Sequence, residues 1–263
     1  MIKRIRSYLQ HQLRAVNRHG VHSPFAFEFI TQVLPHKPTA FGEAAEQWRM
    51  SCLENNTLIQ VEDFGAGYGG KQERFVEKSI AAITKSSARP RREGELLSRI
   101  CKHYDRKNVL ELGTNLGFSA AYLANGVGDK GQVQTIEGAL NIAAFSEETF
   151  SKLKVQVKSL TGEFGKVFPK LDWDNYKPDL VLIDGNHTKE ATIQYFEYLL
   201  PKLEPSAILI FDDIHWSEGM EQAWAHIIAD PKVRLSIDLY AMGIVFLDRN
   251  QAKQHFQFRF RTW

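Results

Sequence analysis

The sequence predicts an α/β protein with a Rossmann-like, doubly wound, seven-stranded and mostly parallel sheet that ends in an antiparallel hairpin. Two observations lead to this prediction. From residue 91 onward, short apolar runs of strand length alternate with longer amphipathic stretches of helix length. Near the C-terminus, VRLSIDLY and GIVFLDR are separated only by Ala241 and Met242. Strands joined so tightly must be antiparallel, because a parallel pair needs a long crossover connection.

The predicted elements follow one another regularly after residue 90. The expected strands are 108–114, 132–137, 155–161, 179–184 and 207–212, followed by the terminal hairpin. The expected helices are 91–104, 118–126, 139–153, 163–170, 189–203 and 217–229. We therefore divide the chain into a mainly helical extension with a Gly-rich lid or hairpin at 1–90, a main domain at 91–250 and a basic, aromatic tail at 251–263.

The N-terminal extension begins with an amphipathic pattern. Apolar residues recur at spacings of three and four, and most of the basic residues lie between them; the apolar positions are Ile2, Ile5, Leu9, Leu13 and Val16. We expect this helix to pack against the main domain or a second subunit, although a basic amphipathic helix can also contact a membrane surface or RNA. The following HGVHSPFAF, residues 19–27, breaks the helix, and its phenylalanines predict that it docks on another element.

Composition limits the class of protein. With 263 residues, 43% hydrophobic and 24% charged, the chain is typical of globular proteins, and a net charge of +2 is too small to argue for a nucleic-acid partner. Cys52 and Cys101 lie far apart without metal-binding spacing, which favours a reduced, cytoplasmic protein. No apolar run approaches the ~18 residues of a membrane span, and the first ten residues lack the apolar core of a signal peptide.

The stretch NVLELGTNLGFS, residues 108–119, is the central motif. An apolar run ends in Gly113-Thr114-Asn115-Leu116-Gly117, and a helical stretch follows. This order of strand, Gly-rich turn and helix lets backbone N–H groups approach a ligand closely. The next predicted strand ends in Glu137, and a carboxylate at that position suits the two hydroxyls of a ribose. The motif therefore predicts a nucleoside-binding crossover.

A second Gly-rich stretch, TLIQVEDFGAGYGG at 57–70, imitates a nucleotide-binding turn more closely. However, the sequence after it leads to Arg89-Pro90-Arg91-Arg92 and not to a second strand with a terminal acid. We interpret it as a flexible hairpin or loop that covers the site. A true phosphate-binding loop remains the alternative.

Three carboxylates follow two predicted strands. Asp184 ends DLVLIDGNH, and Asp212 and Asp213 end AILIFDDIHW. Open α/β sheets bind ligands at the carboxyl ends of their strands, and oxygen ligands suit Mg²⁺ or a similar divalent cation. Alternatively, one aspartate caps the following helix and another is solvated. His187, just beyond Asp184, is a candidate general base.

ELGTNLGFS, TIEG, LIDGNH and FDDIHW, in this order and spacing, resemble class I S-adenosylmethionine-dependent methyltransferases. The branch with the greatest resemblance is the catechol O-methyltransferase type, with the related sugar O-methyltransferases. The resemblance covers roughly residues 91–250. It implies S-adenosylmethionine as the cofactor, a small-molecule hydroxyl as the acceptor and Mg²⁺ as a possible aid.

The resemblance also implies roles for the matching residues. The cofactor would contact Glu111, Gly113, Thr114, Gly117, Ser119, Glu137, Gly138, Gly162, Glu163 and Asp184. Within that set, Glu111, Gly113 and Gly117 would shape the methionine pocket and Ser119 would bind the cofactor carboxylate. Glu137 would hold the ribose, and Gly162 and Glu163 would lie near the adenine.

The catalytic residues implied by the resemblance are Asp184 and His187, and the metal ligands are Asp184, Asp212 and Asp213. Two positions depart from the branch. Its third metal ligand is commonly Asn where this chain has Asp213, and its catalytic Lys is replaced here by His187. We expect an SN2 methyl transfer, with the acceptor pocket built by residues such as Phe25, Phe27 or Tyr68. Trp216 could close the other side of this pocket, but a Trp beside an apolar strand is more often part of the core, and we assign it there.

Three rival functions stay open. A methyltransferase of RNA or protein without metal would use the basic N-terminal helix and the tail QFRFRTW, although a short basic edge strand explains the tail equally well. A nicotinamide-dependent oxidoreductase is disfavoured by the incomplete Gly-rich fingerprint and the terminal hairpin. A non-catalytic module would bind the cofactor without turnover. The acceptor and the oligomeric state are not encoded in these motifs, and the N-terminal helix is compatible with a homodimer.

Overall fold

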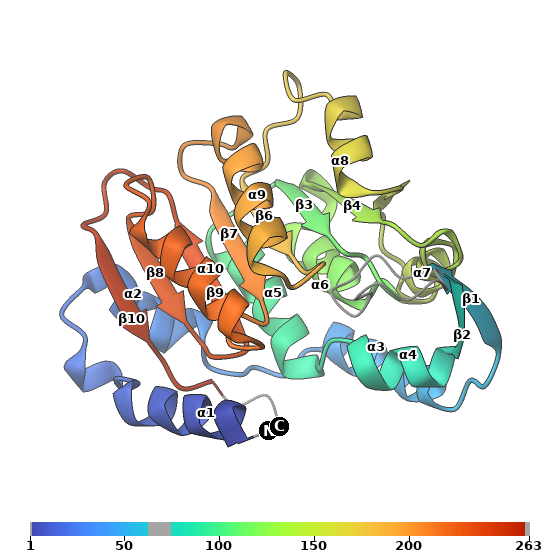
Figure 1. Ribbon diagram of the computed structural model, residues 1–263, viewed down its shortest axis with the longest axis horizontal. Coiled ribbons are helices and arrows are strands. Elements are labelled where there is room, and N and C mark those ends of the chain that lie inside the picture. The colour runs from blue at the N-terminus through green and yellow to red at the C-terminus, as the bar shows by residue number, and fades with distance from the viewer. Residues whose placement is uncertain (1, 63–74, 261–263) are drawn as a thin grey trace. The chain divides into compact units, whose positions relative to one another are not determined.

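The computed structural model describes residues 2–62 and 75–260, which divide into two compact units (Figure 1). The central unit contains His36–Tyr176. The terminal unit combines the chain up to Pro35 with the stretch from Lys177 onward. The domain boundaries expected at residues 90 and 250 stay a prediction. They divide the chain by sequence pattern, whereas the two units are defined by which residues pack together.

The central unit is built on three parallel strands. β3 (Asn108–Leu112), β4 (Gln132–Glu137) and β5 (Lys158–Thr161) lie in that order, and consecutive strands are joined by α6 (Phe118–Val127) and α7 (Leu140–Leu153). α5 (Arg91–His103) precedes β3, and α8 (Phe164–Val167) follows β5. These bounds agree with the predicted elements to within a few residues at each end. Two crossover helices between parallel strands are the arrangement that the alternating pattern predicts.

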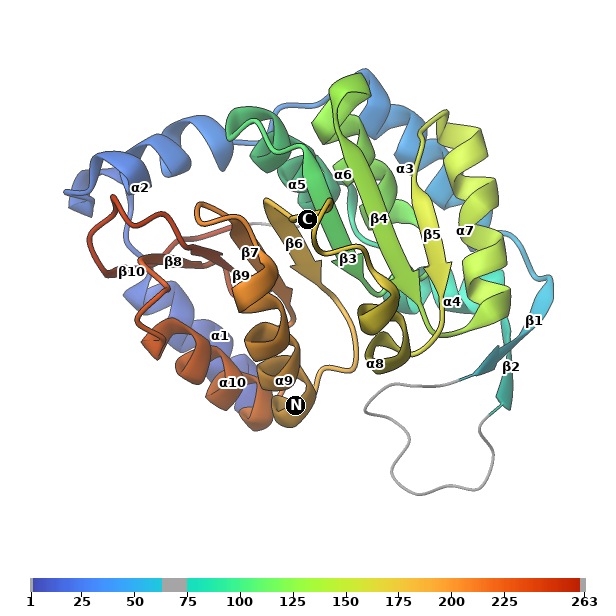
Figure 2. The same ribbon diagram turned by 90° about the horizontal axis from the view of Figure 1, so that it is seen from above.

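Small residues let the helices of the central unit approach closely. A Cβ at Gly94 of α5 would collide with the ring of Tyr122 on α6, and one at Gly126 would lie 2.7 Å from Cβ of Cys101. α3 (Ala40–Leu53) and α4 (Ile80–Ser87) complete this unit, and Figure 2 shows α3 running beside α6 and α7. Trp48 of α3 donates a hydrogen bond from Nε1 to Thr149 Oγ1 of α7, at 3.0 Å. The N-terminal extension thus contributes core to this unit.

The sequence on both sides of the second Gly-rich stretch forms a hairpin. β1 (Leu58–Glu62) pairs antiparallel with β2 (Phe75–Ser79), with Leu58 opposite Ser79 and Glu62 opposite Phe75. This confirms the hairpin reading of the flanks. The DFGAGYGG motif itself, with Tyr68, lies outside the described residues, so its roles as a lid or a phosphate loop stay predictions.

The terminal unit contains five strands in the order β10-β8-β9-β7-β6. β6 (Leu180–Ile183) and β7 (Ile208–Asp212) are parallel, and α9 (Lys189–Leu199) lies between them in the chain. After α10 (Glu218–Ala229), β8 (Leu235–Asp238) and β9 (Met242–Phe246) form the predicted antiparallel hairpin. The helices from the N-terminus are α1 (Ile2–Arg14) and α2 (Pro24–Glu28).

The two faces of β9 receive different helices. The ring of Trp224 on α10 packs so closely on Gly243 that a Cβ there would lie 2.6 Å from it. Phe246 lies three residues further along the strand and therefore faces the other side, where the rings of Phe25 and Phe29 meet it at 4.8 and 6.4 Å. The HGVHSPFAF segment therefore docks on the strand face opposite α10, as its phenylalanines predicted.

The strand count needs one correction. The described residues contain eight strands besides the β1–β2 hairpin, where the sequence predicted seven. The additional strand is β10 (Gln254–Gln257), which pairs in parallel with β8 at the end of the order given above. The start of the tail is thus a short edge strand, one of its two sequence interpretations. No helix that the structure describes is long and apolar enough to cross a membrane.

Candidate functional site

The Gly-rich turn after β3 adopts the backbone that its sequence predicts. Gly113, Asn115 and Gly117 have φ values of +98°, +49° and +84°, so every second residue of the turn is left-handed. The turn closes with a hydrogen bond from the Gly117 N–H to the Thr114 carbonyl, at 2.9 Å, and α6 begins at the next residue. Such a turn needs glycine or asparagine at these positions. Gly117 is also required by packing, because a Cβ there would lie 2.8 Å from the ring of Phe150.

A buried chain of polar groups supports this turn from below. The Thr135 hydroxyl donates to Glu111 Oε2 at 2.5 Å, and the Thr114 hydroxyl lies 2.6 Å from Thr135 Oγ1. Because the Thr135 proton is used by Glu111, Thr114 donates to Thr135. Glu111 is completely buried. Through Thr135 it fixes Thr114 in the turn, and its role in a methionine pocket stays a prediction.

Glu137 joins the turn to the end of β4. Its Oε2 accepts the Asn115 N–H at 2.8 Å, and its Oε1 accepts the Ala139 N–H at 2.9 Å. Burial raises the pKa of Glu137 and outweighs the backbone hydrogen bonds, which act in the opposite direction. The Gly138 N–H also hydrogen-bonds to this carboxylate, so three of its four lone pairs have backbone donors and one remains for a hydroxyl donor. This is the chemistry that the predicted ribose contact requires.

Four more of the predicted cofactor residues lie on neighbouring segments of the same unit, whereas Asp184 belongs to the terminal unit. Ser119 is buried in the first turn of α6, and Gly138 directly follows Glu137. Gly162 has φ +142°, and its N–H donates to the Glu137 carbonyl at 2.8 Å, which brings the end of β5 to the end of β4. Glu163 is partly exposed and forms an ion pair with Lys166 at 2.6 Å. Its predicted place near an adenine is not tested by this contact.

Asp184 and His187 lie together in the terminal unit. Nε2 of His187 is 3.6 Å from Oδ1 of Asp184, within ion-pair range and slightly beyond a hydrogen bond. The backbone between them is unusual, because Asn186 and His187 have φ values of +61° and +25°. The hydroxyl of Thr188, which caps α9, donates to Asn186 Oδ1 at 3.4 Å. Strained, well-supported backbone of this kind is a mark of functional sites.

The predicted metal set is not supported. Among the residues described, no three His, Cys, Asp or Glu side chains are grouped so that they could hold a metal ion. Asp212 ends β7, and Asp213 has φ +53° with its N–H donating to the Ala241 carbonyl at 2.7 Å. The grouping of Asp184, Asp212 and Asp213 around a divalent cation therefore stays a prediction. Trp216 is half-exposed, so its assignment to the core is wrong.

A cluster of charged side chains that the sequence did not predict lies beside Asp213. Asp238, at the end of β8, is buried between two histidines: His11 Nε2 lies 3.1 Å from Oδ1, and His215 Nε2 lies 3.0 Å from Oδ2. The other ring nitrogen of His215 contacts Glu221 at 2.9 Å. Tyr240 stacks on His215, with ring centroids 5.0 Å apart. Only the position of His215 after FDDI gave any sequence signal for this cluster.

The protonation of this cluster follows from its contacts. Burial opposes the positive charge on His215, but its hydrogen bonds to Asp238 and Glu221 outweigh burial and raise its pKa above the ordinary value. Burial would raise the pKa of Asp238, but the hydrogen bonds from His11 and His215 hold it well below its usual range. At neutral pH the Asp238 carboxyl group is therefore ionised and lies between the two histidines. It fixes the β8–β9 turn that Asp213 contacts.

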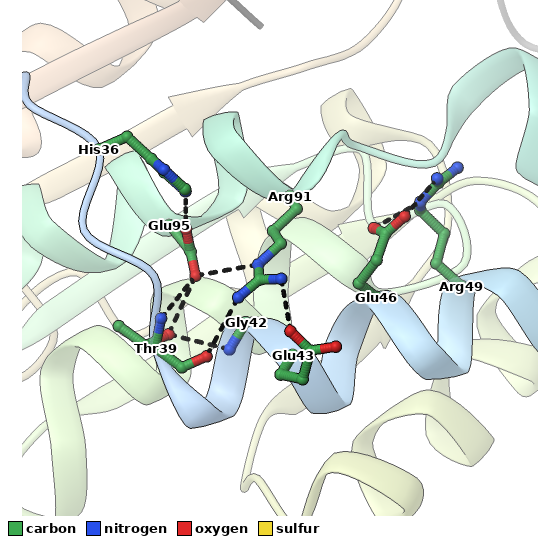
Figure 3. A network of polar contacts seen from close by, with 8 residues as sticks. All are labelled: His36, Thr39, Gly42, Glu43, Glu46, Arg49, Arg91 and Glu95. Atoms are coloured by element: carbon green, nitrogen blue, oxygen red, sulfur yellow. Dashed lines mark hydrogen bonds and ion pairs between the residues drawn. The ribbon is translucent and has the colours of Figure 1, made fainter. Parts of the chain in front are cut away.

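A second unpredicted network lies in the central unit (Figure 3). The buried carboxylate of Glu95 on α5 accepts hydrogen bonds from the Thr39 N–H at 3.0 Å and from Arg91 Nε at 3.2 Å, and His36 Nε2 lies 2.5 Å from it. Burial raises the pKa of Glu95, but these partners outweigh burial and lower it. Gly42 leaves room for the carboxylate, since a Cβ there would collide with it. The network holds the start of α3 against α5.

The central unit thus combines a left-handed Gly-rich turn, a helix that starts directly after it, and a strand-end carboxylate with spare acceptor capacity. These features suit a nucleoside with a flanking charged group. With the strand order and the antiparallel hairpin of the terminal unit, they define the class of protein. The chain has the fold of a class I S-adenosylmethionine-dependent methyltransferase.

Comparisons with known proteins agree with this class. Residues 110–214 match a family model described as a methyltransferase domain. The chain is 28% identical over 123 residues to a catechol O-methyltransferase of Niastella koreensis, covering 46% of this chain and 53% of that protein. It is 27% identical over 124 residues to a catechol O-methyltransferase of Mycobacterium tuberculosis, covering 46% and 54%. The chain thus spans about half the length of these curated relatives.

The fold itself extends further than the sequence similarity. The solved structure of an O-methyltransferase from Bacillus cereus in complex with S-adenosylhomocysteine superposes with a TM-score of 0.53 at 18% identity, and the match covers 84% of this chain and 96% of that one. The resemblance predicted from the sequence is therefore confirmed. Residues 110–214 are thus similar to methyltransferase domains, and the fold is that of solved O-methyltransferases.

Proposed function

We propose that this protein transfers the methyl group of S-adenosylmethionine to a hydroxyl of a small molecule. The observation that carries this proposal is the Glu137 carboxylate, which ties the Gly-rich turn to the end of β4 and still has a lone pair for a ribose hydroxyl. The names of the catechol O-methyltransferase relatives support a small hydroxylated acceptor. When bound, the cofactor supplies an electrophilic methyl group on a sulfonium centre.

The side chains of the central unit have a binding role in this proposal. Glu137 accepts a ribose hydroxyl, and the turn from Gly113 to Gly117 presents backbone groups to the amino-acid end of the cofactor. Ser119, in the first turn of α6, contributes a hydroxyl to the cofactor carboxylate, and Gly162 and Glu163 border the adenine. These assignments follow the predicted roles, and each depends on the backbone positions that the Gly-rich turn fixes.

His187 is the proposed general base. With the Nε2–H directed towards Asp184, the Nδ1 atom carries the lone pair that takes the proton from the acceptor hydroxyl. The hydroxyl oxygen would then be free to take the methyl group, whose bond to the sulfonium sulfur would break and leave its electron pair on a neutral thioether. The positive charge that develops on the imidazole is stabilised by the Asp184 carboxylate, whose Oδ1 is 3.6 Å away. Asp184 is thus a positioning and charge-stabilising residue in this proposal.

The proposal is tested with His187→Asn, using His226→Asn as the matched control because His226 is an exposed histidine of the terminal unit. Calorimetric titration with S-adenosylhomocysteine measures cofactor binding, and transfer of labelled methyl to a panel of catechols and other small hydroxyl compounds measures turnover. We expect unchanged cofactor affinity for both variants and a kcat lowered by roughly 10²–10⁴-fold in His187→Asn alone.

Two results would overturn the proposal. A folded wild-type protein that does not bind S-adenosylhomocysteine lacks the nucleoside site, and a His187→Asn variant with normal kcat has another base. The same assay is run with EDTA and with added Mg²⁺. Loss of turnover in EDTA that Mg²⁺ restores would reinstate the metal role first predicted for Asp184, Asp212 and Asp213.

A further inference from the structure

Helix α1 presents its apolar side to solvent. Leu13 is 84% exposed, Leu9 is 55% exposed and Val16, just after the helix, is 36% exposed. The spacing of four places Leu9 and Leu13 on one face of α1, and Val16 follows where the chain pairs with Phe258. The sequence predicted that this stripe would pack against the main domain or a second subunit. In the part of the terminal unit that the structure describes, these three side chains instead form an exposed stripe, which we call the α1 stripe.

The opposite side of α1 is the one that packs, through polar contacts and through the ring of Tyr8, which meets Tyr240 edge-on at 5.0 Å. His11 is buried and contacts the Asp238 carboxylate at 3.1 Å, and the Ser7 hydroxyl donates to Glu221 at 2.7 Å. The helix is also held at its C-terminal end, where the Val16 N–H donates to the Gln257 carbonyl at 2.9 Å. The polar face is therefore the anchored one, and the α1 stripe is presented outward without any need for the helix to fold on binding.

The surroundings of the α1 stripe carry positive charge. The first 27 residues contain five basic residues and no Asp or Glu; the basic residues are Lys3, Arg4, Arg6, Arg14 and Arg18. Arg6, Arg14 and Arg18 are exposed. Arg259 adds a further cation, since its guanidinium donates to the Gln12 carbonyl of α1 at 2.9 Å. This local charge is larger than the net charge of +2 of the whole chain.

These observations distinguish between the partners that could cover the stripe. A second copy would bring an equally basic helix against this one, and three apolar side chains are far fewer than the roughly 20–30 residues that each partner contributes to a stable dimer. An anionic lipid surface meets both requirements, because basic side chains contact the phosphates and short apolar side chains enter the boundary of the acyl region. We propose that α1 docks this protein peripherally on anionic membranes.

The test is co-sedimentation of the tag-free chain with lipid vesicles. Vesicles of phosphatidylcholine alone are compared with vesicles that contain about 30 mol% phosphatidylglycerol, at about 0.1 M and about 1 M salt. We expect binding to the anionic vesicles only, and weaker binding at high salt. Leu9→Ser/Leu13→Ser is expected to lower the partition coefficient at least about tenfold, because the apolar contribution of two leucines is lost.

Matched controls separate the stripe from general surface effects. Leu58→Ser removes another exposed leucine and is expected to bind as the wild type does. Arg6→Ser/Arg14→Ser should weaken binding by roughly fivefold per charge, whereas Lys85→Ser/Lys170→Ser, two exposed lysines of the central unit, should have a much smaller effect. Circular dichroism and S-adenosylhomocysteine titration confirm that each variant is folded.

Three outcomes would overturn the proposal. The wild type could fail to bind anionic vesicles, or Leu9→Ser/Leu13→Ser could bind them as well as the wild type does. The third is a concentration-dependent dimer in analytical ultracentrifugation that the double leucine variant abolishes, because the stripe would then be covered by a second copy. None of these results depends on methyl transfer, so the docking proposal and the proposed function fail separately.

Discussion

Replacing Glu137 by glutamine tests the nucleoside site most directly. The two carboxylate oxygens accept the N–H groups of Asn115 and Ala139, at 2.8 and 2.9 Å. Glutamine has the same shape but only one acceptor oxygen, and its NH₂ group cannot accept. Whichever way the amide turns, one backbone N–H loses its acceptor and meets a donor. The substitution therefore disturbs the turn and also removes the charge that a ribose hydroxyl would contact.

The size of the effect follows from these two losses. A hydrogen bond to a charged group contributes about 1.5–3 kcal/mol, and a neutral amide retains only part of it. We expect Glu137→Gln to weaken the binding of S-adenosylhomocysteine by about 3 kcal/mol, which is roughly a hundredfold in Kd. Calorimetric titration measures this change. Glu147→Gln, an exposed position on α7, is the control and is expected to change Kd by less than about threefold.

The pH dependence gives an independent check. Burial raises the pKa of Glu137, so the carboxylate becomes protonated at a higher pH than an ordinary glutamate, whose pKa is about 4.3. Affinity for S-adenosylhomocysteine should be full above the raised pKa and decline as the pH falls through it, and the decline should be absent in Glu137→Gln. If this variant is folded and binds within about threefold of the wild type, Glu137 does not hold the ribose, and the reasoning fails.

Three further predictions concern buried groups. Asp238→Asn should lower the free energy of unfolding by about 3 kcal/mol in urea; it should also weaken the pH dependence of that free energy, because the wild-type contribution of His215 is full below about pH 6.5 and is lost as the pH rises through its raised pKa. If the free energy of unfolding of Asp238→Asn differs between pH 6 and pH 9 by as much as that of the wild type, this assignment is contradicted. Glu95→Ala should lower the free energy of unfolding by about 3–5 kcal/mol, since it leaves the buried partners of Glu95 without an acceptor. A decrease below about 1 kcal/mol would show that the network is dispensable. Burial raises the pKa of Cys52 to about 12, so this thiol should react with a disulfide reagent at pH 8 only after unfolding, and fast reaction of the native protein would refute its burial.

The order of strands and helices could be predicted because each element carries a local signal. The runs that became β3, β4 and β6 are short, apolar and followed by glycine or a carboxylate, and the three-residue separation between β8 and β9 permits only an antiparallel pair. The turn at Gly113–Gly117 was predictable for the same reason, since left-handed φ values restrict the residue types. Glu137 and His187 were found from their positions at strand ends.

The clusters around Asp238 and Glu95 could not be predicted in this way. Asp238 collects His11 from α1 and His215 from the loop after β7, and these residues are 227 and 23 positions away in the chain. Glu95 lies in a helix where a carboxylate usually faces solvent, and it is buried because Thr39, Arg91 and His36 surround it. Nothing local in the sequence distinguishes these two acids from solvated ones. Only the pairing of distant segments makes their burial favourable.

Helix α1 shows most clearly where a periodic pattern is insufficient. The apolar spacing correctly predicted a helix, but hydrophobic periodicity defines two faces without saying which one the protein covers. The buried Asp238 carboxylate decides the orientation, because it requires proton donors, and His11 supplies one from the polar face of α1. Turning the helix to bury Leu9 and Leu13 would leave that carboxylate with one histidine fewer. The exposure of the leucines is thus a consequence of charge pairing in the terminal unit. Docking of α1 on an anionic membrane would offset the free-energy cost of that exposure.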